Sequence, residues 1–213
     1  MSEQIGPAAA HEPQWWTAHG LSRAYRQFVA YEAEASAISV YQALFVPGLL
    51  QTEDYARAIS SEILRAAPDH ADVTARVRIR LSRRNGILNR NGTGPRLRMA
   101  LDEAVLRRSV GGAAVMRAQL DQVADLAQRS LIELIVLPLR GHSGLGGTFE
   151  LLEFAPPDRP DIVFVESAAT DFLVDDPSVS RPYRDIMDAL HDQGLTGEAA
   201  LDAVRSARTA LRD

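Results

Sequence analysis

The sequence predicts an α+β fold with a helical N-terminal half, a small and mostly antiparallel sheet of about four strands containing a β-α-β unit, and C-terminal helices. Two observations carry this prediction. Apolar residues recur at helical spacing through most of the first 88 residues. Three runs rich in Val, Ile, Leu and Phe then follow one another between residues 131 and 166, as expected of short strands.

Three helices are expected in the N-terminal half. Residues 15–38 repeat apolar side chains near a period of 3.6, and residues 52–66 and 70–88 show the same spacing. A short extended piece at 40–46 separates the first helix from the second.

The chain is expected to form one integrated domain. Residues 1–14 show no apolar periodicity and are expected to be a disordered tail. The turn-forming run N-R-N-G-T-G-P at 89–95 separates a helical half, residues 15–95, from an α+β half, residues 96–213.

The second half alternates between strand and helix patterns. The expected strands cover residues 96–101, 131–137, 148–154 and 161–166. The expected helices cover residues 102–108, 112–128, 177–193 and 196–211. The first two strands would form the β-α-β unit through the helix at 112–128, and the last three strands would form a hairpin meander.

The run P-G-L-L-Q-T-E-D-Y, which begins at Pro47, combines a turn with a helix start. Pro47 presets φ and Gly48 tolerates positive φ, so the pair predicts a type II turn. Thr52 suits a helix N-cap, and Tyr55 begins the buried face of that helix. Gly48→Val is therefore expected to destabilise the protein more than Arg83→Ala.

Composition excludes several classes of protein. The chain has no cysteine, which excludes disulfides and thiolate metal sites, and its formal charge of −5 argues against a general nucleic-acid binder. All 23 basic residues are arginine, a bias that GC-rich coding explains better than chemistry. No apolar run approaches the roughly 20 residues of a membrane span, and no signal peptide is evident. A cytoplasmic location is expected.

A basic run lies between Val73 and Leu101, where eight arginines occur without Asp or Glu. Such a run could bind nucleic acid or an acidic partner. The simpler interpretation is a solvated helix face whose counter-charges lie elsewhere in an acidic chain.

The glycine-rich loop at 138–147 is a second candidate site. Its glycines could present backbone N–H groups to an anion, and His142 could respond to pH. The loop fits neither the nucleophile-elbow pattern around Ser143 nor a dinucleotide-binding pattern. A flexible hairpin loop is the simpler interpretation.

Carboxylates near expected strand ends form the third candidate. Glu103, Glu150 and Glu166 could converge near His142 in a cleft that holds a cationic ligand or performs acid-base chemistry. The simpler interpretation is that these glutamates pair with arginines such as Arg107. The histidines show no metal-ligand spacing, so neither a metal nor a cofactor is expected.

Several motifs occur in the order found in a known domain. They are Trp15-Trp16, the Pro47–Tyr55 segment with Gln51 and Thr52, L-D-E-A-V-L-R-R at 101–108, V-L-P at 136–138, G-T-F-E-L-L-E-F at 147–154 and V-F-V-E at 163–166. Together they resemble domain of unknown function 5753, which follows Xre-type helix-turn-helix domains in WhiJ-like and antitoxin-like actinobacterial regulators. In that family a helix-turn-helix domain precedes the Trp-Trp position, whereas in this sequence only fourteen residues precede it.

The resemblance implies a regulatory domain that senses a ligand or binds a partner and does not itself read DNA sequence. The expected partners are a small molecule, a small protein encoded nearby or a full-length relative, and a homodimer is a further alternative. The Trp15-Trp16 pair is expected to be a core or docking anchor. A small enzyme with a Glu/His acid-base cleft and a DNA binder using the arginine run are the competing hypotheses.

Overall fold

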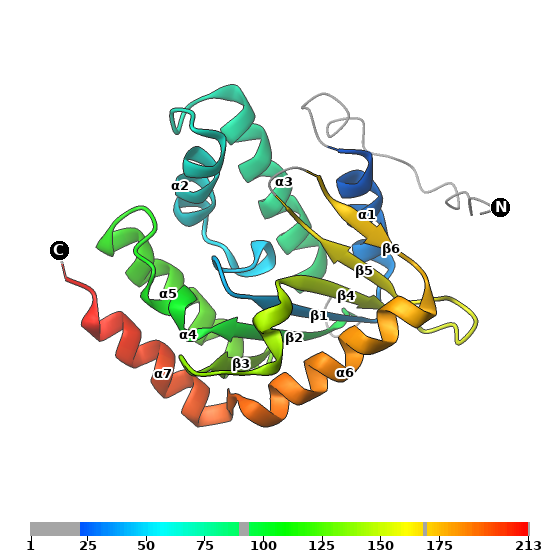
Figure 1. Ribbon diagram of the computed structural model, residues 1–213. Helices are drawn as coiled ribbons and strands as arrows, with labels where there is room; N and C mark the ends of the chain where they lie inside the picture. Colours follow the sequence, from blue (N-terminus) through cyan, green and yellow to red (C-terminus); the bar gives the residue numbers. More distant parts are fainter. Residues whose placement is uncertain (1–21, 90–93, 168–169, 213) are drawn as a thin grey trace.

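The computed structural model describes residues 22–89, 94–167 and 170–212. These residues form a seven-stranded mixed sheet with helices on both faces, in the strand order β6-β5-β4-β1-β2-β3-β7 (Figure 1). The strands are β1 (Ala37–Gln42), β2 (Arg96–Asp102), β3 (Glu133–Leu137), β4 (Phe149–Glu153), β5 (Ile162–Val165), β6 (Phe172–Val174) and β7 (Leu195–Thr196). β1, β2 and β3 run parallel to one another, and the other neighbouring pairs are antiparallel.

Seven α-helices and two 3₁₀ turns connect the strands within the described part of the chain. The α-helices are α1 (Arg23–Glu34), α2 (Glu53–Leu64), α3 (Ala71–Leu88), α4 (Glu103–Arg107), α5 (Ala113–Gln128), α6 (Pro177–Gln193) and α7 (Gly197–Ala210). The 3₁₀ turns are η2 (Gly48–Leu50) and η3 (Ser143–Gly146).

Side-chain caps fix several helix starts. Thr52 accepts a hydrogen bond from the Tyr55 N–H, as its expected N-cap role requires, and Asp102 accepts one from the Ala104 N–H at the start of α4. Because Asp102 is also the last residue of β2, the strand passes directly into a helix at the sheet edge.

Two hydrophobic cores cover the two faces of the sheet. Ile38 and Val40 of β1 face the larger core, to which α1, α2, α5 and α7 contribute. Tyr41 points the other way, into a smaller core closed by Met187 and Leu190 of α6. Successive strand residues face opposite sides, so both faces of the central strands are buried. Figure 1 shows α6 lying along its own face, apart from α1 and α3.

The predicted sheet was wrong in size and pairing. The extended piece near residue 40 is the central strand of the sheet, between β2 and β4, and the helix expected over 15–38 ends at Glu34. β4 forms the expected hairpin with β5, but its other neighbour is β1 rather than β3. The parallel β-α-β unit of β2, α5 and β3 is present as expected. Strands as short as β6 and β7 carry almost no periodicity from which to predict them.

The type II turn predicted at Pro47 and Gly48 was also wrong. Pro47 has φ −51° and ψ 144°, but Gly48 begins η2 without the positive φ that a type II turn needs. The Leu50 N–H donates to the Pro47 carbonyl at 2.9 Å, and the Gln51 N–H donates to the Gly48 carbonyl at 3.3 Å. The turn therefore continues as a 3₁₀ helix.

Candidate functional site

One edge of the sheet gathers most of the predicted site residues. The strand register places the C-terminal ends of β1, β2, β3 and β5 beside the N-terminal starts of β4 and β6. Glu103 follows β2 at this edge, and Glu166 follows β5. The glycine-rich loop leaves β3 and enters β4 here as well. Three steps of about 4.8 Å between neighbouring strands separate β2 from β5, so the two glutamates start roughly 14 Å apart.

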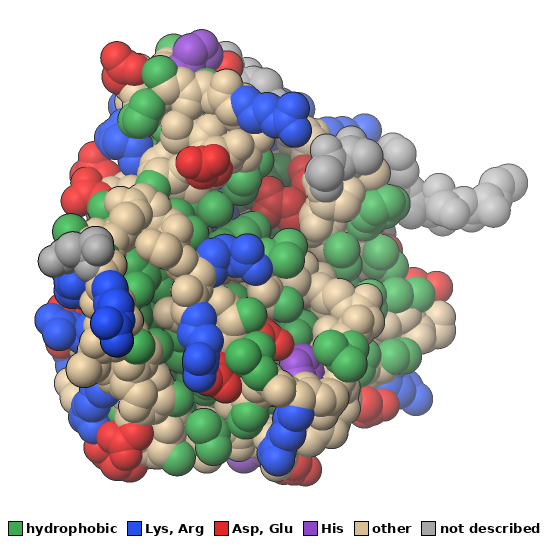
Figure 2. All heavy atoms as spheres, turned by 60° about the vertical axis from the view of Figure 1, so that its left-hand side comes forward, with side chains coloured by type: hydrophobic (Ala, Val, Ile, Leu, Met, Phe, Trp, Pro, Cys, Tyr) green, Lys and Arg blue, Asp and Glu red, His purple; other side chains and the backbone are tan. Residues whose placement is uncertain are grey.

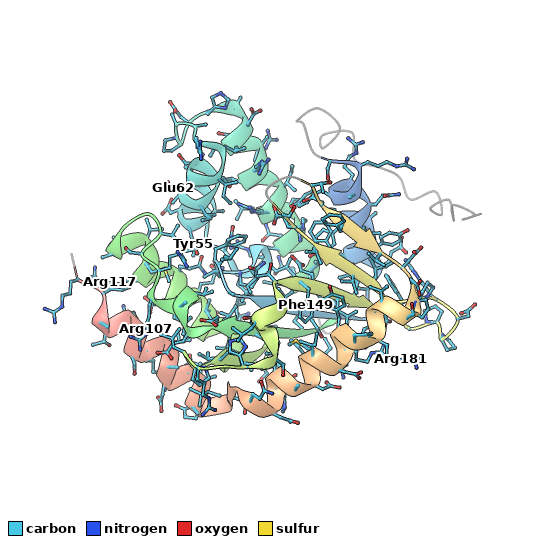
Figure 3. All side chains as sticks on the ribbon, viewed as in Figure 1. Tyr55, Glu62, Arg107, Arg117, Phe149 and Arg181 are labelled. Carbon is cyan, nitrogen blue, oxygen red and sulfur yellow. The ribbon has the colours of Figure 1, made fainter. Side chains whose placement is uncertain are left out.

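A cavity of about 700 Å³ opens between this edge and α6. Its walls come from the turn after β1, the glycine-rich loop, the ends of β4 and β5, and α6. They include Leu44, Ser143, Gly146, Gly147, Phe149, Val165, Glu166, Val179, Tyr183 and Ile186. The Tyr183 ring packs edge-on against Phe149, with centroids 4.9 Å apart, and Figure 3 shows Phe149 directed toward α6. The cavity is mainly apolar, and Glu166 gives it one carboxylate.

His142 anchors the glycine-rich loop rather than lining the cavity. Its side chain is 2% exposed, and its Nε2 lies 3.0 Å from Asp102 Oδ2. Nδ1 accepts a hydrogen bond from the Gly144 N–H, so Nε2 carries the proton and donates to the carboxylate. With both ring nitrogens occupied, His142 is not placed to act as a general base on a cavity ligand.

Two further contacts fix the same loop. Ser143 exchanges two hydrogen bonds with the Gln193 side chain, each 2.9 Å long, which ties the loop to the end of α6. Gly144 lies against Tyr41, where a Cβ atom would come within 2.5 Å of the ring. Burial, and secondarily Asp102, raises the pKa of Tyr41 to about 12, so the phenol stays neutral. The loop is thus held by hydrogen bonds and packing instead of being a loose hairpin.

Glu103 and Arg107 lie apart from this cavity. They form an ion pair along α4, and the second carboxylate oxygen of Glu103 accepts the Leu139 N–H at 3.2 Å. Both side chains line a separate cavity of about 460 Å³ against α7. The structure therefore brings Glu166 and the glycine-rich loop together, whereas Glu103 faces another cavity.

A buried ion pair covers the opposite face of the sheet. Arg83 of α3 donates two hydrogen bonds to Glu32 of α1, each 2.7 Å long, and the side chains are 7% and 1% exposed. Arg83 also donates to the Tyr25 hydroxyl at 2.7 Å and lies over the Phe28 ring, 4.9 Å from its centroid. The pair locks α1 onto α3.

Glu150 of β4 faces this pair. Burial raises the pKa of its carboxyl group to about 8, and the negative charges of Glu32 and Glu166 add to the effect while Arg83 and Arg80 oppose it. Arg80, itself buried, donates to Ser60 Oγ at 2.6 Å. Near neutral pH the Glu150 carboxyl group is therefore mainly protonated, although the charges of Arg83 and Arg80 favour its ionised form.

The arginine run is not a uniform solvated face. Arg80 and Arg83 turn inward, and Arg84 donates to the Gln51 carbonyl at 2.8 Å. The counter-charges do come from elsewhere in the chain, as Arg98 shows by pairing with Glu133 and Asp188. Arg90 lies outside the described residues.

Sequence reasoning missed two residues that organise these sites. Glu32 occupies the buried stripe of α1, one turn after Phe28, and a carboxylate on such a stripe signals a buried partner. Asp102 ends β2 and holds His142 in place, whereas the sequence pattern had singled out its neighbour Glu103. Trp15 and Trp16 lie outside the described residues.

A comparison of the sequence with known protein families finds a match. Residues 25–206 match the family described as Domain of unknown function (DUF5753). The chain belongs to that family. The match covers the whole described sheet, the buried ion pair and the cavity beside α6. It leaves out the first residues of α1 and the end of α7, which contributes Ala207 and Ala210 to the smaller cavity. No match was found among curated proteins.

The described part of this DUF5753 domain shows neither a membrane span nor a metal-binding cluster. None of its described helices combines the length and apolarity of a membrane span. Within the same residues, no three His, Asp or Glu side chains are grouped so as to hold a metal ion.

Proposed function

We propose that this chain is the regulatory domain of an antitoxin-like actinobacterial transcriptional regulator of the Xre family, and that it acts by binding a small molecule or a partner's side chain in the cavity beside α6. The cavity carries the proposal. Its volume of about 700 Å³ falls within the range typical of small-molecule sites, and such sites have mostly apolar walls with a few polar groups.

Binding is better supported than catalysis at this edge of the sheet. Both nitrogens of His142 are occupied, and the Glu103 carboxylate pairs with Arg107 and the Leu139 N–H. The cavity itself offers Glu166 and the hydroxyl groups of Ser143 and Tyr183 without a base arranged to activate either. A ligand with an apolar body and a neutral or cationic polar group fits this lining.

The cavity can be tested with a neutral fluorescent probe, N-phenyl-1-naphthylamine, whose emission rises in apolar surroundings. The parent protein should bind it saturably. Ile186→Trp, which fills the cavity, should abolish the signal. Ile63→Trp is the matched control, because Ile63 is 47% exposed on α2, away from the cavity.

Equal binding by the parent and Ile186→Trp would refute the cavity as the binding site. If the probe binds in the cavity as expected, its displacement by candidate metabolites would identify the class of ligand. Glu166→Gln should weaken cationic competitors more than neutral ones, since Glu166 supplies the carboxylate of the cavity wall.

A further inference from the structure

The face of the sheet opposite α6 carries a second group of polar residues, of which only Glu166, just after the end of β5, also lines the cavity. It consists of Gln42, Glu150, Glu166, Arg80 and the pair Glu32–Arg83, which we term the polar recess. Figure 2 shows acidic side chains set back in a hollow beneath the α2–α3 hairpin.

Strand register places the sheet residues of the polar recess together. Glu150 pairs with Val40 on one side and Phe164 on the other, and Gln42 lies two residues beyond Val40. Gln42 and Glu150 are therefore diagonal neighbours on one face, about 7–8 Å apart. Glu166 lies two residues beyond Phe164, and its charge acts on both Glu150 and Arg80.

Gln42 supplies an independent sign of a ligand. Only 6% of the residue is exposed, and its Oε1 has no hydrogen-bond partner within the described part of the chain. Leaving a buried acceptor without a partner is unfavourable, so such groups normally meet a donor. The Glu150 carboxyl group beside it offers a second oxygen acceptor when ionised.

The charges of the polar recess show which donor would fit. Glu32 neutralises Arg83 through the two-bond ion pair, and Glu150 and Glu166 face Arg80. Three carboxylates thus meet two guanidinium groups, and one positive charge is lacking when all three carboxylates are ionised. Arg76 adds a further repulsion on Arg80.

We propose that the polar recess binds the ammonium group of a small primary amine, with Gln42 Oε1, the Glu150 carboxylate and Glu166 around it. An ammonium group carries three N–H donors and one positive charge, which meet the acceptors and the charge deficit together. Gln42 and Glu150 lie on the opposite face of the sheet from the proposed ligand cavity and do not line it, and the two sites share only Glu166.

Binding should release a proton. At pH 7 the free protein holds the Glu150 proton, because burial raises the pKa of that carboxyl group to about 8. An ammonium ion favours the ionised carboxylate, so the affinity should rise about tenfold per pH unit from pH 6 to 8 and level off above that range.

The experiment uses butylamine, with 1-butanol as a neutral probe of the same length, and follows NMR titrations of the whole chain at several pH values. The parent protein should bind butylamine with the expected pH slope and should not bind 1-butanol. The Glu150→Gln variant should bind butylamine weakly and without pH dependence. Glu62→Gln, an exposed exchange of the same kind on α2, should behave as the parent does (Figure 3).

Gln42→Met gives a second variant in case Glu150→Gln does not fold, and it should weaken binding while keeping the pH slope. Binding of butylamine that is unaffected by pH, or equal binding of 1-butanol, would overturn the proposal. Ile186→Trp should leave butylamine binding unchanged, because that side chain lines the cavity on the α6 face. Loss of binding in Ile186→Trp alone would assign the amine to the cavity and also overturn the proposal.

Discussion

Replacing Arg83 by alanine should destabilise this domain more than most single substitutions. The change would leave Glu32, which is 1% exposed, as a buried carboxylate without its two hydrogen bonds. Breaking a buried ion pair on one side costs about 3–5 kcal/mol. For a domain of this size, 1 kcal/mol shifts the melting temperature by about 2–4 °C, so Arg83→Ala should melt about 6–20 °C below the parent.

Thermal unfolding followed by circular dichroism at pH 7 provides the assay, with Gly48→Ala as a backbone control. A Cβ atom at Gly48 would lie 3.8 Å from Arg83 Nη1 and 3.9 Å from Arg80 Cγ, which are ordinary contacts. Gly48→Ala should therefore melt close to the parent. A type II turn at Gly48 would make substitution there more destabilising than Arg83→Ala. The structure predicts the opposite order.

A double-mutant cycle with Glu32→Leu and Arg83→Met tests the physical reason. Removing both side chains leaves no unpaired charge, so the double variant should be more stable than either single one. If Arg83→Ala melts within about 2 °C of the parent, the pair contributes little and the reasoning fails.

Three further predictions concern pH, packing and DNA. Burial raises the pKa of Glu150 to about 8, so the unfolded chain loses this proton at a lower pH than the folded chain does. The contribution of Glu150 to the free energy of unfolding therefore falls as pH rises from about 4.5 to 8. The slope is roughly 1.4 kcal/mol per pH unit. In urea unfolding, the free energy of unfolding of Glu150→Gln should rise relative to that of the parent between pH 5.5 and 8. A difference between the two proteins that does not change with pH would contradict this. Gly144→Ala should cost about 1–3 kcal/mol because its Cβ would meet the Tyr41 ring at 2.5 Å, whereas Gly146→Ala has nothing within 4 Å and should be mild; equal melting temperatures would disprove the packing argument. In gel shifts, the isolated chain should not bind its own upstream DNA specifically, and competitor-resistant binding below about a micromolar at physiological salt would reverse that expectation.

Local chemistry made several elements predictable from the sequence. The Thr52 cap placed the start of α2, and the alternation of strand and helix between residues 96 and 137 indicated the parallel β2–β3 unit. The helical spacing places Tyr55, Ile59 and Ile63 on one face of α2. In the structure Tyr55 and Ile59 are buried, whereas Ile63, in the last turn, is exposed. A periodic pattern shows which face of a helix is buried but not where the neighbouring element ends.

Long-range pairing was not predictable from local patterns. Nothing near residue 40 indicates that β1 lies between β2 and β4, because each partner is distant in sequence. The same limit applies to Arg83, which looked like one of several solvated arginines until the fold placed Glu32 beside it. Glu103 and Glu166 follow strands and Glu150 lies within one, but only the register shows that Glu150 faces the buried ion pair.

The central position of β1 has a consequence for how the protein is made. Ile38 pairs with Leu97 on one side and with Leu152 on the other, so the second partner emerges from the ribosome more than 100 residues after β1. Until then β1 presents an open strand edge flanked by apolar side chains, which is prone to pair with other chains. Fragments that end before β4 should aggregate during synthesis, and folding of the full chain should be slow for its size because contacts of high sequence separation close last.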